Sequence, residues 1–401
     1  MDRIKPLKSF VKVYFLLIAA FFLSMVLVYC IPASWIQSNV EASLEVMENE
    51  GERPLYAFYR HSAIVDNHTD MLMYESLLPS DQYNLVQASV SINHYPRYWH
   101  GYQVILRPIS ILFQVQEVRY LGMLAFYLLY FWSAYLVARR TSFSCAMLYV
   151  LTIASGYLGV VATCFQYLTS FYVLFAALIV LLGRYRGISS MNVALFFFVV
   201  GMVENFFDFL TYPIITLGIP LIVLLWMRAR EEQADFADNL KLTVQTSAAW
   251  GFGYALAWVA KWILAAVILG VRYFWRSLTT AKYRMLGNEE EPIDRIGTIR
   301  KNLKAWMNVQ DEGLITWSKV VLLILVIAII LVLVKKLMDK RTVGACLPML
   351  LVAAYPYLWF LVLSNHSQIH FWYTYRSQLV ALFGILMFVA GIIKAKEGEK
   401  T

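Results

Sequence analysis

Long apolar runs separated by short polar segments dominate the chain. About ten of them approach the length that an α-helix needs to cross the hydrocarbon core of a bilayer, roughly 30 Å. They lie near residues 13–31, 118–138, 143–162, 165–183, 190–208, 211–227, 245–270, 317–334, 343–363 and 378–393. This pattern predicts an all-α, polytopic transmembrane protein of about ten spans.

Composition agrees with this prediction and excludes other classes. Of the 401 residues, 60% are hydrophobic and only 15% are charged, which is more apolar than a soluble domain of this length can bury. The net charge of +8 comes from Lys and Arg at the ends of apolar runs, where they anchor helices, so nucleic-acid binding is not expected. The four cysteines read as core residues: Cys30, Cys145, Cys164 and Cys346.

The distribution of basic residues predicts the orientation. Clusters in the N-terminal head and near 139–140, 184–186, 228–241, 335–341 and 394–400 all fall on one side, which the positive-inside bias makes the cytoplasm. Both termini are then cytoplasmic, and we expect the protein to lie in the plasma membrane. The expected order is a head and first helix (1–31), an outer segment of interfacial helices (32–117), spans two to seven (118–271), a second outer segment (272–316), and spans eight to ten with a tail (317–401).

Two pairs of acids are candidate site residues on the outer side. Asp66 and Asp70 are one helical turn apart in the first outer segment, and Glu204 and Asp208 share a face at the outer end of the fifth span. Each pair can converge on one proton or on a divalent cation, Mg²⁺ or Mn²⁺. The structural alternatives are a helix cap with a solvated acid for the first pair and an interfacial acid for the second.

Basic and aromatic residues form the other candidates. His366, His370, Tyr375 and Arg376 lie in the segment that joins the last two expected spans on the outer side, where His and Arg can bind a phosphate. An aromatic belt with incidental histidines is the alternative. Lys261, deep in the seventh span, must pair with an acid, snorkel or line a wet cavity that binds phosphate.

The first outer segment also contains an aromatic stretch at residues 94–102. Tyr95 and Trp99 in it are candidate substrate-binding residues. The orientation was derived from basic residues elsewhere, yet it places the acid pairs and the His/Arg segment on the same side. The sequence therefore predicts one extracytoplasmic site.

A single span, then a long outer segment with acids, then many spans with polar outer loops resembles the GT-C superfamily of membrane glycosyltransferases. The resemblance implies a GT-C-like fold and transfer of a sugar from a polyprenyl-phosphate carrier to an extracytoplasmic acceptor: a cell-envelope glycan, a lipid or a protein. It also implies an acidic base in the first outer segment. The stretch Asp66-Asn67-His68-Thr69-Asp70 departs from the usual Asp-Glu pair and from a DxD motif, so the choice between Asp66 and Asp70, and metal dependence, stay open.

The resemblance assigns the remaining roles. Asp66 would take the proton of the acceptor hydroxyl, and the other three acids would position the acceptor or a cation. The donor phosphate would be neutralised by His366, His370, Arg376 and Lys261, with Tyr375 beside them. A single displacement would invert the anomeric centre.

Two other functions compete with this one. A transporter or lipid-linked glycan flippase would use the outer acids and Arg376 as gates. A membrane acyltransferase would use His366 or His370 as its base, but it leaves the four acids without a function.

Overall fold

A computed structural model describes residues 4–56, 61–79, 82–92, 95–184, 190–290, 292–307 and 339–393. Within these ranges the chain is mainly helical, and an isolated antiparallel bridge joins Leu55 and Ile64. The all-helical class is confirmed. The expected span at 317–334 lies outside the described residues.

The helices follow one another in this order: α1 (Ile4–Tyr29), α2 (Ala33–Glu50), η1 (His61–Ala63), α3 (Asn67–Glu75), α4 (Leu85–Ser91), α5 (Gln103–Ile109), α6 (Val115–Arg140), α7 (Phe143–Ala154), α8 (Leu158–Thr163), α9 (Phe165–Arg184), α10 (Ser190–Phe207), α11 (Ile214–Arg230), α12 (Phe236–Leu269), α13 (Arg272–Leu286), α14 (Arg295–Trp306), α16 (Lys340–Ala353), α17 (Tyr355–Val362), α18 (Ser364–Ile369), α19 (Phe371–Thr374), η3 (Tyr375–Gln378) and α20 (Leu379–Ile392).

Six stretches in the described ranges are long and apolar enough to cross a membrane: Leu7–Tyr29, Val115–Arg140, Phe165–Arg184, Phe236–Leu269, Thr342–Val362 and Phe371–Ile392. The membrane class is therefore supported, while the total of ten remains a prediction. The expected span at 143–162 is interrupted, because Tyr157 has a left-handed backbone (φ 61°) between α7 and α8. The run at 211–227 forms α11, whose 17 residues measure about 26 Å.

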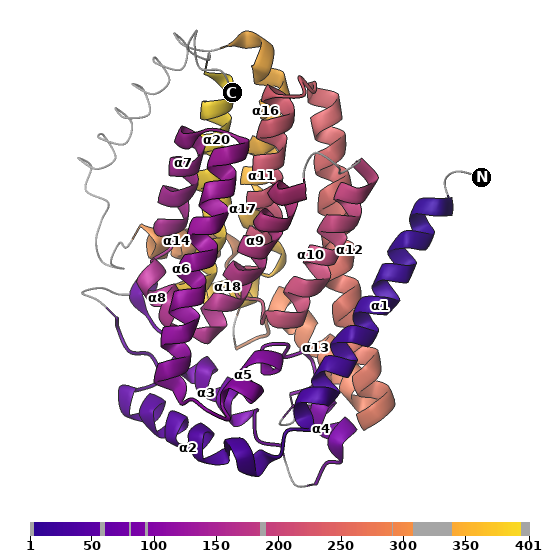
Figure 1. Ribbon diagram of the computed structural model, residues 1–401, viewed down its shortest axis with the longest axis vertical. Helices are drawn as coiled ribbons and strands as arrows, with labels where there is room; N and C mark the ends of the chain where they lie inside the picture. The colour runs from indigo at the N-terminus through magenta and orange to yellow at the C-terminus, as the bar shows by residue number, and fades with distance from the viewer. Residues whose placement is uncertain are drawn as a thin grey trace.

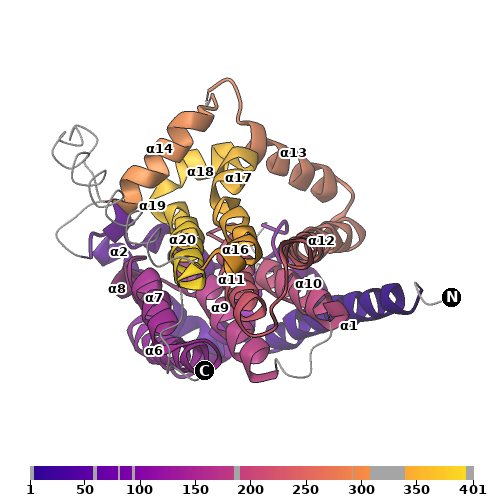
Figure 2. The same ribbon diagram turned by 90° about the horizontal axis from the view of Figure 1, so that it is seen from above.

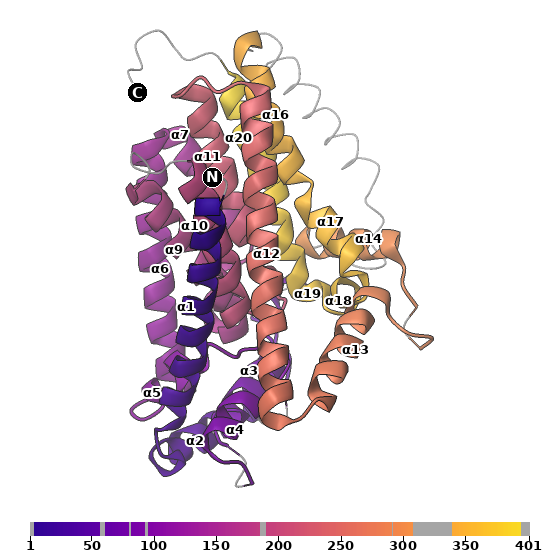
Figure 3. The same cartoon turned by 90° about the vertical axis from the view of Figure 1, so that its right-hand side faces the viewer.

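The long helices run alongside one another, and short helices cover one end of the bundle. Helix α2 lies across that end, next to α3, α4 and α5 (Figure 1). We call it the capped end. The start of α1 and the finish of α20 both lie away from it (Figure 1), whereas α13 and α14 flank α18 and α19 on one side (Figure 3).

Burial places α11 at the centre of the bundle, because nearly every residue of this helix is buried. By contrast, α1 lies at the periphery with most of its surface exposed. Helices α10 and α12 approach each other most closely at Gly201 and Gly253. A Cβ on Gly201 would lie 2.2 Å from the carbonyl oxygen of Trp250, and a Cβ on Gly253 would lie 2.1 Å from that of Phe198. Only glycine permits this backbone contact.

A buried arginine fixes the connection between the bundle and the capped end. Arg107, on α5, donates to the carbonyl oxygens of Val28 (3.0 Å), Ile31 (2.7 Å) and Leu77, and its guanidinium lies 4.4 Å from the ring centre of Tyr29. It thereby satisfies carbonyls left open where α1 ends. The segment that follows α1 is held against α5.

Candidate functional site

Asp66 lies immediately before α3 and joins this helix to the C-terminal part of the chain. Its Oδ1 accepts a hydrogen bond from the amide of Thr69 (3.2 Å), so Asp66 is the N-cap of α3. Its Oδ2 accepts one from the indole N–H of Trp372 (3.3 Å), and the Arg53 guanidinium lies 4.6 Å from the centre of that indole ring. Asp66 is 2% exposed. Asp66 is therefore a helix cap, as one alternative predicted, and it also accepts a long-range hydrogen bond.

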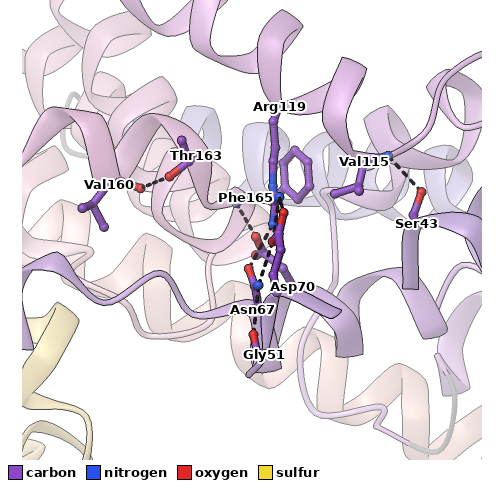
Figure 4. Close-up of polar contacts among 10 residues, drawn as sticks. Ser43, Gly51, Asn67, Asp70, Val115, Arg119, Val160, Thr163 and Phe165 are labelled. Carbon is purple, nitrogen blue, oxygen red and sulfur yellow. Dashed lines mark hydrogen bonds and ion pairs between the residues drawn. The ribbon is translucent and has the colours of Figure 1, made fainter. Parts of the chain in front are cut away.

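Asp70 has a different environment. Its Oδ2 accepts from the amide of Phe165 (2.9 Å) and its Oδ1 from that of Gln166 (3.0 Å), so the carboxyl group satisfies the first turn of α9. Figure 4 shows Asp70 directed at the Phe165 amide. Burial raises the pKa of Asp70 to about 7, against the opposing effects of Arg119 and the two amides. Asp70 thus attaches α3 to α9.

A second set of contacts at α3 involves Arg119 of α6, which the sequence analysis did not single out. It donates to both carboxylate oxygens of Glu50 (2.8 and 3.0 Å) and to Asn67 Oδ1 (3.0 Å). The Asn67 amide in turn donates to Glu50 Oε2 (2.9 Å). It also donates to the Gly51 carbonyl (3.0 Å), as Figure 4 shows. These contacts from α2 and α6 therefore hold the start of α3, next to Asp66, in place.

Glu204 and Asp208 are linked through hydroxyl groups. The Ser170 hydroxyl donates to Glu204 Oε1 (2.6 Å) and lies 3.1 Å from that of Thr211. The Thr211 amide donates to both Asp208 oxygens (3.1 and 3.0 Å), and its hydroxyl also donates to Asp208. Glu204 Oε2 and Asn205 Oδ1 are buried without a hydrogen-bond partner among the described residues. Buried polar atoms of this kind are available to a ligand or water.

The two histidines are neutral. Burial and nearby Arg284 lower the pKa of His366 to about 3, while its Nε2 lies 2.7 Å from the Leu210 carbonyl and must donate to it. Burial, His366 and Arg284 lower the pKa of His370. Arg284 donates to His370 Nε2 (3.0 Å), and the imidazole ring stacks on Tyr373 at 5.3 Å. The two histidines therefore act as hydrogen-bonding groups, and the positive charge beside them is carried by Arg284.

Tyr373 marks the point where the distant segments meet. Its ring stacks on that of His370, which accepts from Arg284, and packs at 5.6 Å on that of Trp372, which donates to Asp66. Asp208 and Tyr98 lie within electrostatic range of its phenol. Arg284 is partly buried, and its Nε has no hydrogen-bond partner among the described residues. We call this set the Tyr373 cluster: Asp66, Tyr98, Asp208, Arg284, His366, His370 and Tyr373.

Arg376 is fully buried and lies outside the Tyr373 cluster. It donates to the carbonyls of Gly156 (2.8 Å) and Ser62 (3.4 Å), and its guanidinium packs on the rings of Tyr167 (4.5 Å) and Tyr375 (4.7 Å). Tyr375 donates to the same Ser62 carbonyl at 3.3 Å. These contacts hold η1 and the connection between α7 and α8 against η3. Tyr167 stands between Arg376 and Tyr373, 5.9 Å from the latter.

Lys261 and Trp99 belong to the packing of α4, and of the segment that follows it, on α12. Lys261 donates to the Val90 carbonyl (2.9 Å) and lies 5.6 Å from the Trp99 ring, whose indole donates to the Ala257 carbonyl (2.8 Å). Among the described residues its partner is thus a carbonyl and not the acid that was one expectation, and its binding of a phosphate stays a prediction. A backbone carbonyl at the end of α4 provides its partner.

Tyr95 joins the cluster indirectly. Its ring stacks on Tyr98 at 5.7 Å, and the Arg97 guanidinium lies 3.8 Å from its centre. The described ranges contain no group of three or more His, Cys, Asp or Glu placed to hold a metal ion, so a cation held by the paired acids stays a prediction.

The Tyr373 cluster combines carboxylates, phenols and a guanidinium in a buried setting. A carboxylate can accept a proton from a hydroxyl group, and a guanidinium can bind a phosphate. No family model, no curated protein and no solved structure matches the chain. Its function is therefore inferred from the chemistry of the cluster.

Proposed function

We propose that this protein is a membrane glycosyltransferase that moves a sugar from a polyprenyl-phosphate carrier to a hydroxyl group of a cell-envelope glycan, lipid or protein. The observation that carries this proposal is that Asp66 and Arg284 bind neighbouring residues of one segment: Trp372 donates to Asp66 (3.3 Å), and His370, whose ring lies 5.2 Å from that of Trp372, accepts from Arg284 (3.0 Å). A base and a phosphate-binding cation are the two groups that such a transfer needs, one on each side of the anomeric carbon.

The reaction is a single displacement. The acceptor hydroxyl gives its proton to Asp66 while its oxygen attacks the anomeric carbon. The bond between that carbon and the phosphate oxygen breaks, and the phosphate leaves with the electron pair. Arg284 stabilises the charge that develops on the leaving phosphate. The product has the inverted anomeric configuration, because no carboxylate becomes covalently attached.

Asp66 is a better candidate base than Asp70. Both oxygens of Asp70 accept backbone amides, whereas Asp66 Oδ2 accepts, among the described residues, only the Trp372 indole, at 3.3 Å. Glu204 and Asp208 are assigned to the acceptor, because Glu204 keeps one unpartnered oxygen among the described residues. Lys261 is assigned to the scaffold, since it donates to a backbone carbonyl. Arg376 is assigned to it as well, because it donates to two carbonyls and packs on two rings, which outweighs the lack of a partner for its Nη1 among the described residues.

The proposal includes a topology. We propose that the capped end faces away from the cytoplasm in the plasma membrane, with about ten spans and both termini cytoplasmic. The start of α1 and the finish of α20 lie away from the capped end (Figure 1), which agrees with termini on one side. The basic clusters that flank the apolar runs support the same orientation.

Purified protein in liposomes, supplied with radiolabelled polyprenyl-phosphate sugars and envelope acceptors, tests the proposal. Wild-type protein should transfer the label, and Arg284→Gln should lower kcat/KM by about 10²–10³-fold. Arg276→Gln is the matched control, because Arg276 lies on the same helix α13 with an exposed side chain. Equal rates for the two variants would contradict the assignment. A wild-type protein that consumes no donor but accumulates a substrate in vesicles would be a transporter or flippase.

A further inference from the structure

A large apolar groove opens between the helices of the bundle. It has a volume of about 870 Å³ and is lined by residues of α5, α6, α9 and α10, together with Met73 of α3. Small residues on α6 and α9, Gly122, Ala125, Ala176 and Ala177, make room for it. Helices α6, α9 and α10 form the face of the bundle opposite α13 and α14 (Figure 2). We call it the α6–α10 groove.

The polar groups in its lining are already used by the protein. The Tyr172 hydroxyl donates to the Gly122 carbonyl (2.7 Å), the Thr169 hydroxyl to the Gln166 carbonyl (3.0 Å), and the Tyr102 hydroxyl lies 2.8 Å from that of Ser76. The groove therefore offers an occupant little besides apolar contact. Polar solutes lose hydrogen bonds in such surroundings, whereas a hydrocarbon chain does not.

The dimensions of the groove suit one extended chain. Its lining follows α9 from Phe165 to Val180, which corresponds to about 22 Å of helix. Helices α6 and α9 are candidate membrane spans, so the groove runs along the hydrocarbon core, which is roughly 30 Å thick. Val180, Leu121 and Ile105 in the lining are 47%, 40% and 52% exposed, so the groove is accessible from the outside of the bundle.

One end of the groove adjoins the proposed active site. Phe207 lines the groove immediately before Asp208 of the Tyr373 cluster. Tyr102 in the lining packs on Phe209 at 5.3 Å, and Phe209 packs on Tyr98 of the Tyr373 cluster at 5.4 Å. A chain in the groove would thus have its polar head next to the cluster.

We propose that the α6–α10 groove binds the hydrocarbon chain of the lipid carrier that delivers the sugar. The proposal rests on the proposed function, because that function supplies a substrate with an apolar chain and a phosphate head. It assigns the recognition of the chain to apolar residues that face the membrane, away from the residues that carry out the transfer.

Two tryptophan variants distinguish an effect of blocking the groove from an effect elsewhere on the apolar surface. Ala176→Trp places a large ring in the groove at an exposed position of α9, where the core is not disturbed. Leu128→Trp is the matched control, since Leu128 on α6 is 63% exposed and does not line the groove. Both variants should fold like the wild type, as judged by thermal unfolding in detergent.

The binding experiment uses a polyprenyl phosphate with a photoreactive diazirine in its chain, in phosphatidylcholine vesicles. Crosslinks are expected on lining residues of α6, α9 and α10, displaced by unlabelled polyprenyl phosphate and reduced about tenfold in Ala176→Trp only. Equal displacement by phosphatidylcholine, or crosslinks on other helices, would overturn the proposal. This experiment needs no catalytic turnover, so it does not depend on the transfer assay.

The kinetic experiment compares long-chain and short-chain sugar donors with a fixed acceptor. Ala176→Trp should raise the KM of the long-chain donor about tenfold and leave that of the short-chain donor unchanged. An unchanged KM for both donors, with active wild-type protein, contradicts the groove proposal and spares the proposed function. A raised KM for a lipid acceptor alone would assign the groove to the acceptor and also overturn the proposal. Wild-type protein that transfers no sugar would contradict the proposed function instead.

Discussion

Asp66 and Trp372 are 306 residues apart, yet the indole of Trp372 donates a hydrogen bond to the Asp66 carboxylate at 3.3 Å. This contact joins the N-cap of α3 to α19 and directs one oxygen of Asp66 towards the Tyr373 cluster. A base must be held within a fraction of an ångström of its working position to be efficient. Trp372 is therefore a positioning residue for Asp66.

Trp372→Phe removes this hydrogen bond and keeps an aromatic ring beside Arg53. We expect kcat to fall roughly tenfold, because the carboxylate loses its orientation, while the KM of the donor changes little. Steady-state kinetics with both substrates measures the two effects separately. A kcat equal to that of the wild type would show that Trp372 does not position Asp66.

The Asp70 carboxyl group predicts a pH effect on stability. Its pKa is about 7 in the folded protein, above the ordinary 3.8, because it is buried. Folding therefore favours the protonated form, and the corresponding stabilisation is complete below about pH 4 and is lost as the pH rises through 7. Asp70→Asn should remove this dependence and cost about 1–3 kcal/mol, because one α9 amide loses its acceptor. Thermal unfolding of both proteins between pH 4 and pH 8 is the measurement, and parallel curves would contradict the assignment.

The glycine contact between α10 and α12 predicts a packing defect. Gly201→Ala would place a methyl group 2.2 Å from the Trp250 carbonyl oxygen, so the helices must separate. We expect a loss of about 1–3 kcal/mol in the free energy of unfolding. Gly251→Ala on α12 is the control, because a Cβ there has no neighbour within 4 Å among the described residues. Similar stability of the two variants in a denaturation assay would refute the close contact.

Arg376 should behave as a scaffold residue. Arg376→Gln loses hydrogen bonds to the Gly156 and Ser62 carbonyls, so we expect a loss of roughly 2–3 kcal/mol in stability. The kcat of the folded fraction and the KM of the donor should stay within about twofold of the wild type. Arg139→Gln, at an exposed position of α6, should change neither quantity. A higher donor KM at unchanged stability would return Arg376 to phosphate binding.

The sequence predicted the helical membrane class well, because apolar runs of sufficient length report it directly. It did not predict the break at Tyr157, since a left-handed tyrosine leaves no pattern in a hydrophobic run. The short helices expected in the first outer segment are present as α2 to α5, and their position at the membrane interface stays a prediction. Their arrangement depends on partners such as Arg107 and Arg119, which local patterns do not reveal.

The site was only partly accessible from the sequence. The spacing of Asp66 and Asp70 in the first outer segment pointed to Asp66, and positions at the outer ends of the expected spans pointed to Asp208 and His370, all of which lie near Tyr373. Arg284 gave no comparable signal, because it is one of several basic residues on α13 and its contact with His370 spans 86 residues. The role of Asp70 as a cap for α9 depends on an equally long-range contact. Such pairings follow from tertiary packing, which local patterns do not encode.

The most direct test of the account is the rate of sugar transfer by Asp66→Asn compared with Asp70→Asn, in purified protein with a polyprenyl-phosphate sugar under single-turnover conditions. Loss of the base should lower the rate of Asp66→Asn by about 10²–10⁴-fold, with donor binding retained. The folded fraction of Asp70→Asn should keep most of its rate. Undiminished transfer by a correctly folded Asp66→Asn variant would contradict the central claim.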